Sequence, residues 1–426
     1  MNFISYYLNS KKDICRAILI FSSFYIFYFF INIPYILFMS EHTKILSEHN
    51  PFYGVPFGLN LFNFDPSMYY GFNNSSIIHP LFNIVTGTLT MIAKLSVGNL
   101  LFLFIQSAIN SLSVLCLYFY LQKCSSTYFI PLMIAIFFGI SSYNIFTAFI
   151  PDSYPYAQLI LIISVLYLQY SRKLDKTRTL PSAILLLFNF SITSTNVLPT
   201  AGALFFNLIS KHYKKTILKF LVILSVFLTL VVILTIAQNI IFNKHSWINN
   251  ISKSINNGGY SYVGTFSFQQ HWKAIYMLVI SPILTPVIAM VDPKIVAFAT
   301  DLNKSYPIYV SITGFTMIVA AGLGFLIKIK TREAWVLFMY PAFAFSLHIL
   351  EGYGLKAFNY DMYLYAGHYL FAFFLLCGLF ITSLKKTKFR TSVIAILLLC
   401  IGITIYNNVI LHTKTLAYIK NFYEIL

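Results

Sequence analysis

Two aspartates are the residues best suited to catalysis in a chain that otherwise carries little charge. Asp65 precedes Pro66, and Asp152 stands between Pro151 and Pro155. A carboxylate at the boundary between water and lipid can remove the proton from an acceptor hydroxyl while that oxygen attacks an activated carbon. We therefore expect Asp65 to be the general base and Asp152 to be a second catalytic residue. A structural role is the alternative for both, because Asp followed by Pro is a standard helix start and Asp152 also suits a cap or turn.

A second set of polar residues has the chemistry to bind a substrate. His79 could form a hydrogen bond with a phosphate or a sugar hydroxyl, although a lone histidine is as often a structural group. Lys356, Tyr365 and His368 combine a cation with two hydrogen-bond donors, which suits the phosphate of a lipid. Glu351 precedes them in the chain and belongs to the same candidate site. The alternative for this group is a snorkelling lysine among interfacial aromatic side chains.

The sequence offers little support for a metal or a nucleotide. The histidines are scattered, and neither H-x-x-x-H nor H-E-x-x-H occurs. We therefore expect no metal ligands and no resident cofactor, while a divalent metal in the reaction stays open. Neither a Walker loop nor a G-x-G-x-x-G loop is present, so nucleotide-driven transport by this chain alone is not expected.

The composition places these residues in a membrane protein. Of the 426 residues, 58% are hydrophobic and only 10% are charged, and the mean hydropathy is +0.75. A soluble globular protein has roughly 25% charged residues. The first apolar run, Ala17 to Met39, is long enough to cross ~30 Å of hydrocarbon and is expected to be a retained span. The net charge of +17 does not indicate nucleic acid, because the basic residues sit in short clusters between apolar runs, next to lipid head groups.

The clusters of Lys and Arg predict the orientation of the chain. Placing them all in the cytoplasm leaves most of the acids on the other side. The resulting fold class is an all-α polytopic domain, residues 1–426, with about eleven transmembrane helices. These cover residues 17–39, 99–121, 128–149, 154–170, a hairpin at 180–210, and then 216–242, 307–329, 334–350, 362–384 and 391–411.

Two outer segments contain apolar stretches that the orientation forbids from crossing the membrane once. The first outer loop is 40–98, where residues 79–95 are expected to form an interfacial or re-entrant helix starting near Pro80. The second is 243–306, where residues 275–291 are interrupted by Pro282 and Pro286. All the candidate site residues then face one compartment, and ionisable groups that converge at a membrane edge indicate function.

This layout resembles the GT-C superfamily of integral membrane glycosyltransferases. The matching features are Asp65 before Pro66 in the first outer loop, the following His79-Pro80-Leu81 element, Asp152 in the second outer connection, and the late Glu351 with residues 365–368. The chain also looks like the serotype-converting, O-antigen-modifying type of bacterial glucosyltransferase. The resemblance implies a polyprenyl-phosphate sugar donor and an inverting transfer, in which Asp65 deprotonates the acceptor while the lipid phosphate leaves. In this first loop Asp65 has no adjacent acidic partner, which leaves metal dependence open.

The predicted function is therefore transfer of a hexose to a lipid-linked glycan or another envelope acceptor on the outer face of the bacterial inner membrane. A small flippase and a polyprenyl-phosphate sugar synthase are the expected partners, beside membrane lipids. One alternative is a polysaccharide or lipid flippase, which should place charge along the crossing path. Another is an envelope polymerase or acyltransferase, which would ideally show an arginine-rich outer loop.

Overall fold

Six helices in the described part of the chain are long and apolar enough to cross a membrane. The computed structural model describes residues 2–48, 59–64, 67–73, 75–210, 212–242, 246–249, 251, 262–356, 360–385 and 387–424. The six are α2 (Lys11–Glu41), α5 (Asn99–Cys124), α11 (Tyr213–Ile241), α14 (Ile308–Ile327), α15 (Arg332–Phe345) with the π-helical turn η4 (Ser346–Leu350), and α17 (Lys388–Tyr423).

Shorter helices complete the bundle. The sequence predicts further spans where the structure has five shorter helices. Three of them are apolar helices of 10 to 17 residues, namely α6 (Phe129–Gly139), α9 (Thr179–Ile192) and α16 (Leu370–Ser383), and the other two are α8 (Tyr154–Lys173) and α10 (Val197–Leu208). The prediction of a mainly helical membrane protein is confirmed, whereas the number of about eleven spans stays a prediction.

The outer helices expose their apolar side chains. Only 22% of the apolar window of α2 and of α11 is buried inside the protein. On α11, Ile217, Leu228 and Ile240 are among the exposed side chains. A soluble monomer does not expose continuous apolar surfaces of this kind, so these faces fit contact with lipid.

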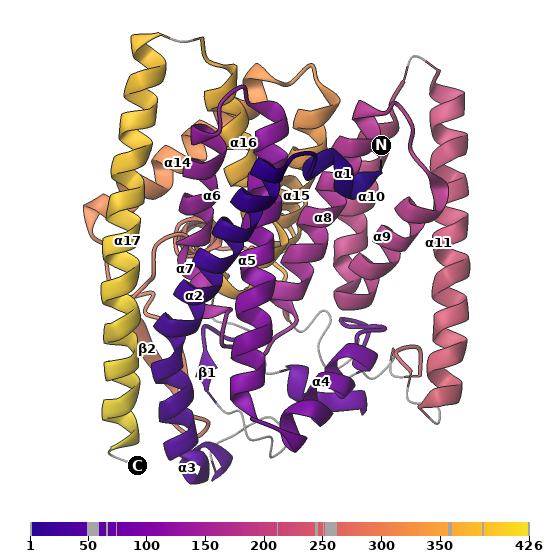
Figure 1. Cartoon of the computed structure of the whole chain (residues 1–426). Helices are drawn as coiled ribbons and strands as arrows, with labels where there is room; N and C mark the ends of the chain where they lie inside the picture. The colour runs from indigo at the N-terminus through magenta and orange to yellow at the C-terminus, as the bar shows by residue number, and fades with distance from the viewer. Residues whose placement is uncertain are drawn as a thin grey trace.

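The basic helix ends meet at one end of the bundle, which is the upper end in Figure 1. There Arg172, in the last turn of α8, donates hydrogen bonds to Asn207 of α10 (2.8 Å) and to Tyr120 of α5 (3.3 Å). It also pairs with Glu333 in the first turn of α15 at 3.5 Å. At the start of α2, Asp13 accepts a hydrogen bond from Gln122 of α5 at 3.0 Å. Helices α3 (Thr43–Glu48) and α4 (Asn83–Leu95) and the C-terminus lie at the opposite end.

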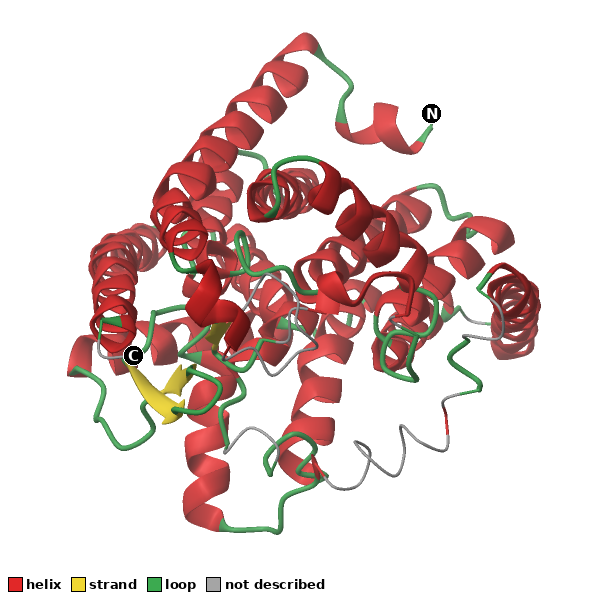
Figure 2. Ribbon diagram, turned by 90° about the horizontal axis from the view of Figure 1, so that it is seen from below, coloured by secondary structure: helices red, strands yellow, loops and turns green. Residues whose placement is uncertain are grey.

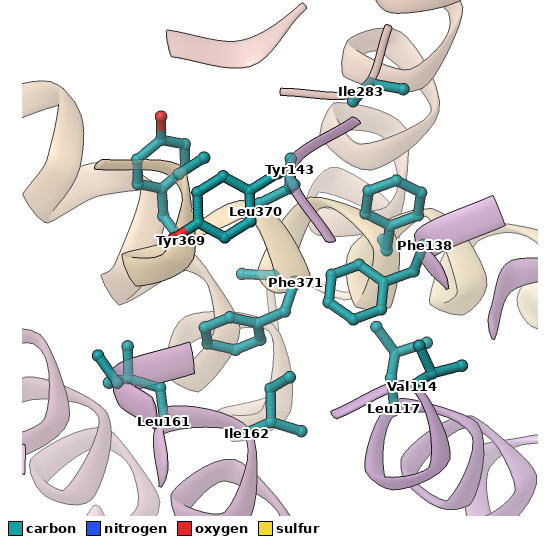
Figure 3. Packing of buried hydrophobic residues seen from close by; sticks show 14 of the residues in the cluster. Val114, Leu117, Phe138, Tyr143, Leu161, Ile162, Ile283, Tyr369, Leu370 and Phe371 are labelled. Atoms are coloured by element: carbon teal, nitrogen blue, oxygen red, sulfur yellow. The ribbon is translucent and has the colours of Figure 1, made fainter. Parts of the chain in front are cut away.

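The centre of the bundle is packed with large apolar side chains. Figure 3 shows Val114 and Leu117 of α5 close to Phe138 of α6, with Leu161 of α8 and Phe371 of α16 nearby. All five side chains are fully or almost fully buried. Close packing of these helices provides the rigid frame from which the site residues project.

The predicted span 128–149 is broken in two. Helix α6 ends at Gly139, and the short helix α7 (Ser142–Phe146) follows. The backbone N–H groups of Ser142 and Tyr143 donate to the carbonyls of Ile283 and Pro282, at 3.0 and 2.9 Å. The backbone N–H groups at the break therefore find their acceptors in the apolar stretch 275–291 of the second outer segment. Residues 280–284 of that stretch are buried in the bundle.

A small sheet joins the two outer segments, and the sequence did not predict it. Strand β1 (Asn60–Leu61) pairs in parallel with β3 (Ala297–Thr300), which pairs antiparallel with β2 (Ile288–Asp292). Figure 2, seen from the lower end, shows these strands beside the C-terminus. Strands of two to five residues carry almost no periodic signal, and their partners lie far away in the chain. The stretch 275–291 is made up of the end of helix α13 (Phe268–Val279), a turn and most of strand β2. It is therefore not a single span.

Helix α4 buries polar residues and exposes apolar ones, as expected of a helix in contact with lipid. Its buried face consists of Asn83, Thr86, Thr90 and small residues, while its exposed face includes Ile84 and Met91. The amide of Asn83 and the hydroxyl of Thr86 donate to backbone carbonyls of η1 (Ser67–Asn73) at 3.0 and 2.9 Å. A helix was predicted here, as an interfacial or re-entrant element, and the observed helix begins at Asn83 and not at Pro80.

Candidate functional site

A cavity of about 340 Å³ collects four of the predicted site residues. His79, Asp152, Tyr365 and His368 all line it, although up to 289 sequence positions separate them. Its other lining residues are Asn63, Ile77, Ile78, Tyr154, Thr193, Ser194, Thr195, Asn196, Pro199, Tyr262, Tyr340, Phe343, Ala344, Leu347, His348, Tyr353 and Leu364. Helices α8, α10 and α15 contribute Tyr154, Pro199 and Tyr340 to the wall, and the turn that follows α9 contributes Thr193 to Asn196.

Asp152 lies in the connection between α7 and α8 and is 1% exposed. One carboxylate oxygen, Oδ1, accepts hydrogen bonds from the backbone N–H and the hydroxyl of Ser153, the latter at 3.1 Å. The N-cap of α8 is Ser153 rather than Asp152. Both hydrogen bonds are made to Oδ1, so Asp152 brings a carboxyl group to the cavity wall.

His79 is oriented by the α9–α10 turn. Its Nδ1 atom lies 2.5 Å from the carbonyl oxygen of Ile192, which identifies Nδ1 as the protonated nitrogen in the neutral ring. Burial lowers the pKa of His79. The ring therefore stays neutral near pH 7, and its other nitrogen, Nε2, is left as an acceptor.

His348 was missed in the sequence, because it lies inside an apolar helical run. The π-helical turn η4 (Ser346–Leu350) carries it at the end of α15, and its side chain is 2% exposed. Its Nδ1 atom lies 2.9 Å from the carbonyl oxygen of Tyr353. Its ring lies against Tyr365, with centroids 4.1 Å apart. π-Helical turns inside α-helices often occur at functional sites, which is the one signal that points to this residue.

The short helix η5 (Tyr363–His368) carries Tyr365 and His368. The His368 ring contacts the Tyr154 ring, with centroids 5.0 Å apart. Burial, with the nearby His348 and His79, lowers the pKa of His368 to about 3. Burial raises the pKa of Tyr365, so its hydroxyl stays protonated and can act as a donor.

A strained turn brings Asn63 to the cavity. Phe62 and Asn63 both have positive φ angles, of 55° and 60°. The strain at Phe62 is held in place because its ring stacks on Tyr363, with centroids 4.2 Å apart, and its N–H donates to the carbonyl of Phe298 at 2.8 Å. Asp65, the predicted base, follows Asn63 by two positions and lies outside the described residues.

Glu351 and Lys356 are not among the residues that line the cavity. Both are exposed, in the irregular segment that follows η4. Their charges stay in solvent, where an ion loses no hydration, while the neutral residues between them turn inward. The structure therefore separates these two predicted binding residues from the other four.

Several buried polar atoms of the cavity wall lack a hydrogen-bond partner within the described part of the chain. They include Asn63 Nδ2, Thr193 Oγ1, Asn196 Nδ2 and His368 Nδ1. An unpaired buried polar atom costs about 1–3 kcal/mol, so several such atoms around one cavity indicate a polar occupant.

The cavity wall contains no lysine or arginine among the described residues. Within those residues, no three His, Cys, Asp or Glu side chains are grouped so that they could hold a metal ion. The expectation that the chain carries no metal ligands stays a prediction. Imidazoles, hydroxyls, amides and one carboxylate are therefore the groups that the described wall offers to a ligand.

An apolar groove of about 380 Å³ adjoins the polar cavity. Residues 77–79 and 193–196 line the cavity, and the adjacent residues 81–85 and 191–192 line the groove. Side chains of α8, α9 and α11 complete the groove, and Ile84 and Phe188 in its wall are about half exposed, at 49% and 48%. The contact between His79 and Ile192 thus marks the boundary between a polar and an apolar compartment.

The chain has no match among protein-family models, curated proteins or solved structures.

Proposed function

We propose that this chain is an integral membrane glycosyltransferase that moves a hexose from a polyprenyl-phosphate donor to a lipid-linked glycan or another envelope acceptor. The observation that carries the proposal is the cavity that Asp152, His79, Tyr365 and His368 share. A carboxylate beside several imidazoles and hydroxyls, in a cavity away from the cationic helix ends, is suited to acid–base chemistry on a sugar.

The neighbouring groove supports a donor with a lipid tail. An isoprenoid chain would lie on the apolar wall of the groove, and its phosphate would then reach the boundary at His79. A free nucleotide sugar would make no use of this groove. The juxtaposition of an apolar and a polar compartment therefore favours a lipid-linked sugar over a soluble one.

The proposed reaction is a single displacement. Asp65 takes the proton of an acceptor hydroxyl, and the acceptor oxygen forms a bond to the anomeric carbon. The bond between that carbon and the phosphate oxygen breaks, and the electron pair leaves with the lipid phosphate. Tyr365 donates a hydrogen bond to the departing phosphate oxygens. The Asp152 carboxylate stabilises the positive charge that develops on the sugar ring.

A flippase fits the contacts less well. A flippase needs a polar path across the membrane, whereas Arg172, Glu333, Tyr120 and Asn207 bond to one another at the basic end of the bundle. The cavity residues lie at the other helix ends. We place the reaction on the outer face of a bacterial inner membrane, in line with the distribution of the basic residues.

The test is sugar transfer by the purified full-length protein in lipid nanodiscs, with polyprenyl-phosphate glucose, galactose and mannose as donors. Asp65→Asn and Asp152→Asn each remove one charge and preserve size. Each is expected to lower the transfer rate by about 10²-fold or more, as for loss of a catalytic acid or base.

The matched control is Glu351→Gln, which removes an exposed acid that does not line the cavity. This variant should transfer sugar at the wild-type rate. Full transfer by the Asp65→Asn variant would remove Asp65 from the base role. Absence of transfer by the wild-type protein from all three donors to membrane-extracted lipid-linked glycans would contradict the proposed function.

A further inference from the structure

We infer that the turn between α9 and α10, together with Asn63, forms a recognition subsite for the hydroxyl groups of an uncharged hexose. This inference rests on the proposed function and specifies the class of sugar. It arises from three of the unpaired polar atoms: Asn63 Nδ2, Thr193 Oγ1 and Asn196 Nδ2. The last two belong to one short segment, and all three line the same cavity.

The turn holds these groups rigidly. Thr193 ends α9, and its N–H donates to the carbonyl of Asn189 at 3.1 Å. The N–H of Asn196 donates to the carbonyl of Thr193 at 2.9 Å. The N–H of Ser194 donates to the carbonyl of Ile78 at 2.9 Å, which ties the turn to the neighbouring segment that carries His79. The backbone hydrogen bonds are therefore made, whereas the Thr193 and Asn196 side chains keep unpaired atoms.

Burial makes these unpaired atoms costly in the empty protein. Thr193 is 6% exposed and Asn196 is 1% exposed, so neither has ready access to bulk water. A ligand that supplies hydroxyl groups would satisfy the amide donors and the threonine hydroxyl at once, because a hydroxyl both donates and accepts. A site built in this way selects strongly against a ligand that lacks the hydroxyl.

The charges of the wall indicate an uncharged sugar. Asp152 is the carboxylate among the lining residues, and no Lys or Arg of the described chain faces the cavity. A carboxylate on the sugar ring would lie near Asp152 without a compensating cation, which is unfavourable at low dielectric. The aromatic rings of Tyr340, Tyr353 and Tyr365 offer apolar surface for the C–H face of a neutral ring.

The experiment measures ligand-induced thermal stabilisation of the purified full-length protein in detergent. The probes are polyprenyl phosphate alone and the same lipid carrying glucose, galactose, mannose or glucuronate. We expect one or more of the neutral hexosyl lipids to raise Tm above the value with polyprenyl phosphate alone, and the glucuronosyl lipid to give no such extra shift.

The variants Thr193→Val and Asn196→Leu replace the unpaired polar groups with apolar groups of similar size. Each should weaken binding of the preferred hexosyl lipid by about tenfold or more, and leave binding of polyprenyl phosphate unchanged. Thr193→Val should also raise Tm of the empty protein, because it removes an unpaired buried hydroxyl. A merely structural role for Thr193 would have the opposite effect.

Thr86→Val on α4 is the comparison variant, because the Thr86 hydroxyl has a partner, the carbonyl of Gly71 at 2.9 Å. It should lower Tm and leave the extra shift from the sugar intact. Equal shifts with and without the sugar, a preference for glucuronate, or unchanged sugar binding in the Thr193 and Asn196 variants would each overturn the inference. Loss of transfer in the Asp65 and Asp152 variants tests the proposed function separately, because it is read from the reaction and not from binding.

Discussion

The imidazole of His348 lies against the phenol ring of Tyr365, with ring centroids 4.1 Å apart and ring planes inclined by 32°. The two residues come from different elements, the π-helical end of α15 and the short helix η5. Their contact joins two walls of the polar cavity. The orientation of Tyr365 depends on this contact and on the space that Gly354 leaves for the phenol hydroxyl.

Gly354→Ala should disturb the cavity. Gly354 has a φ of +90°, and a Cβ atom there would lie 2.7 Å from the Tyr365 hydroxyl oxygen. We expect a loss of about 1–3 kcal/mol in stability from the positive φ and displacement of Tyr365. Thermal unfolding in detergent and the transfer assay would measure both effects. Gly322→Ala in α14 is the control, since nothing lies within 4 Å of the new Cβ, and it should unfold at or slightly above the wild-type temperature.

Stability should fall when the pH drops below about 6.5, the usual pKa of a histidine in an unfolded chain. The folded protein holds His368 neutral, with a pKa of about 3, and burial lowers the pKa of His79 in the same direction. At pH values between the folded and the unfolded pKa of these histidines, the unfolded chain binds protons that the folded chain does not. The free energy of unfolding therefore decreases with falling pH, by at most about 1.4 kcal/mol per pH unit for each group.

His368→Gln removes one of these contributions. Its Tm should decrease less than that of the wild-type protein between pH 7 and pH 5, measured in one detergent at constant ionic strength. An identical pH dependence of the two proteins would show that folding does not change the pKa of His368.

The network around Arg172 should contribute to stability at the basic end of the bundle. Arg172→Met leaves Glu333 without its cation and Asn207 without its donor. We expect the variant to lose about 1–3 kcal/mol, as for a partly buried charged group that loses its partner. Glu333→Gln keeps an acceptor for the Tyr120 hydroxyl and should cost less. Equal unfolding temperatures for all three proteins would mean that water screens this pair completely.

The orientation of the chain can be tested by labelling single cysteines in a variant without native cysteines. Asn303 and Lys330 are both exposed, in the second outer segment and beside the basic end of α14. A membrane-impermeant maleimide added to intact spheroplasts should label position 303, whereas position 330 should require permeabilisation. The reverse pattern would place the polar cavity in the cytoplasm.

The sequence alone was sufficient to predict the helical, membrane-embedded class of the protein. Most predicted spans correspond to observed helices, including α5 at 99–124 and α14 at 308–327. A helix within residues 79–95 was also predicted, and α4 covers residues 83–95. These features follow from local properties, since the length of an apolar run and the position of Lys and Arg act within one segment.

Only some of the residues that line the cavity could be predicted from the sequence. His79, Asp152, Tyr365 and His368 were expected in one site, and they line one cavity. His348 was missed, and Glu351 and Lys356 were expected there but lie in solvent. The residue type indicates which chemistry a side chain can perform. The direction in which that side chain points depends on the packing of elements that are distant in the chain.

The sequence by itself therefore indicated a helical membrane protein, predicted that its cations gather at one end, and showed which rare polar residues could do chemistry. Only the tertiary structure decided which of those residues meet, that α6 and α7 break where residues 280–284 enter, and that a three-stranded sheet joins the outer segments. The physical reason is that hydropathy is a sum over neighbouring residues. A cavity, in contrast, is defined by side chains from separate segments, whose relative positions are set by close packing of the whole bundle.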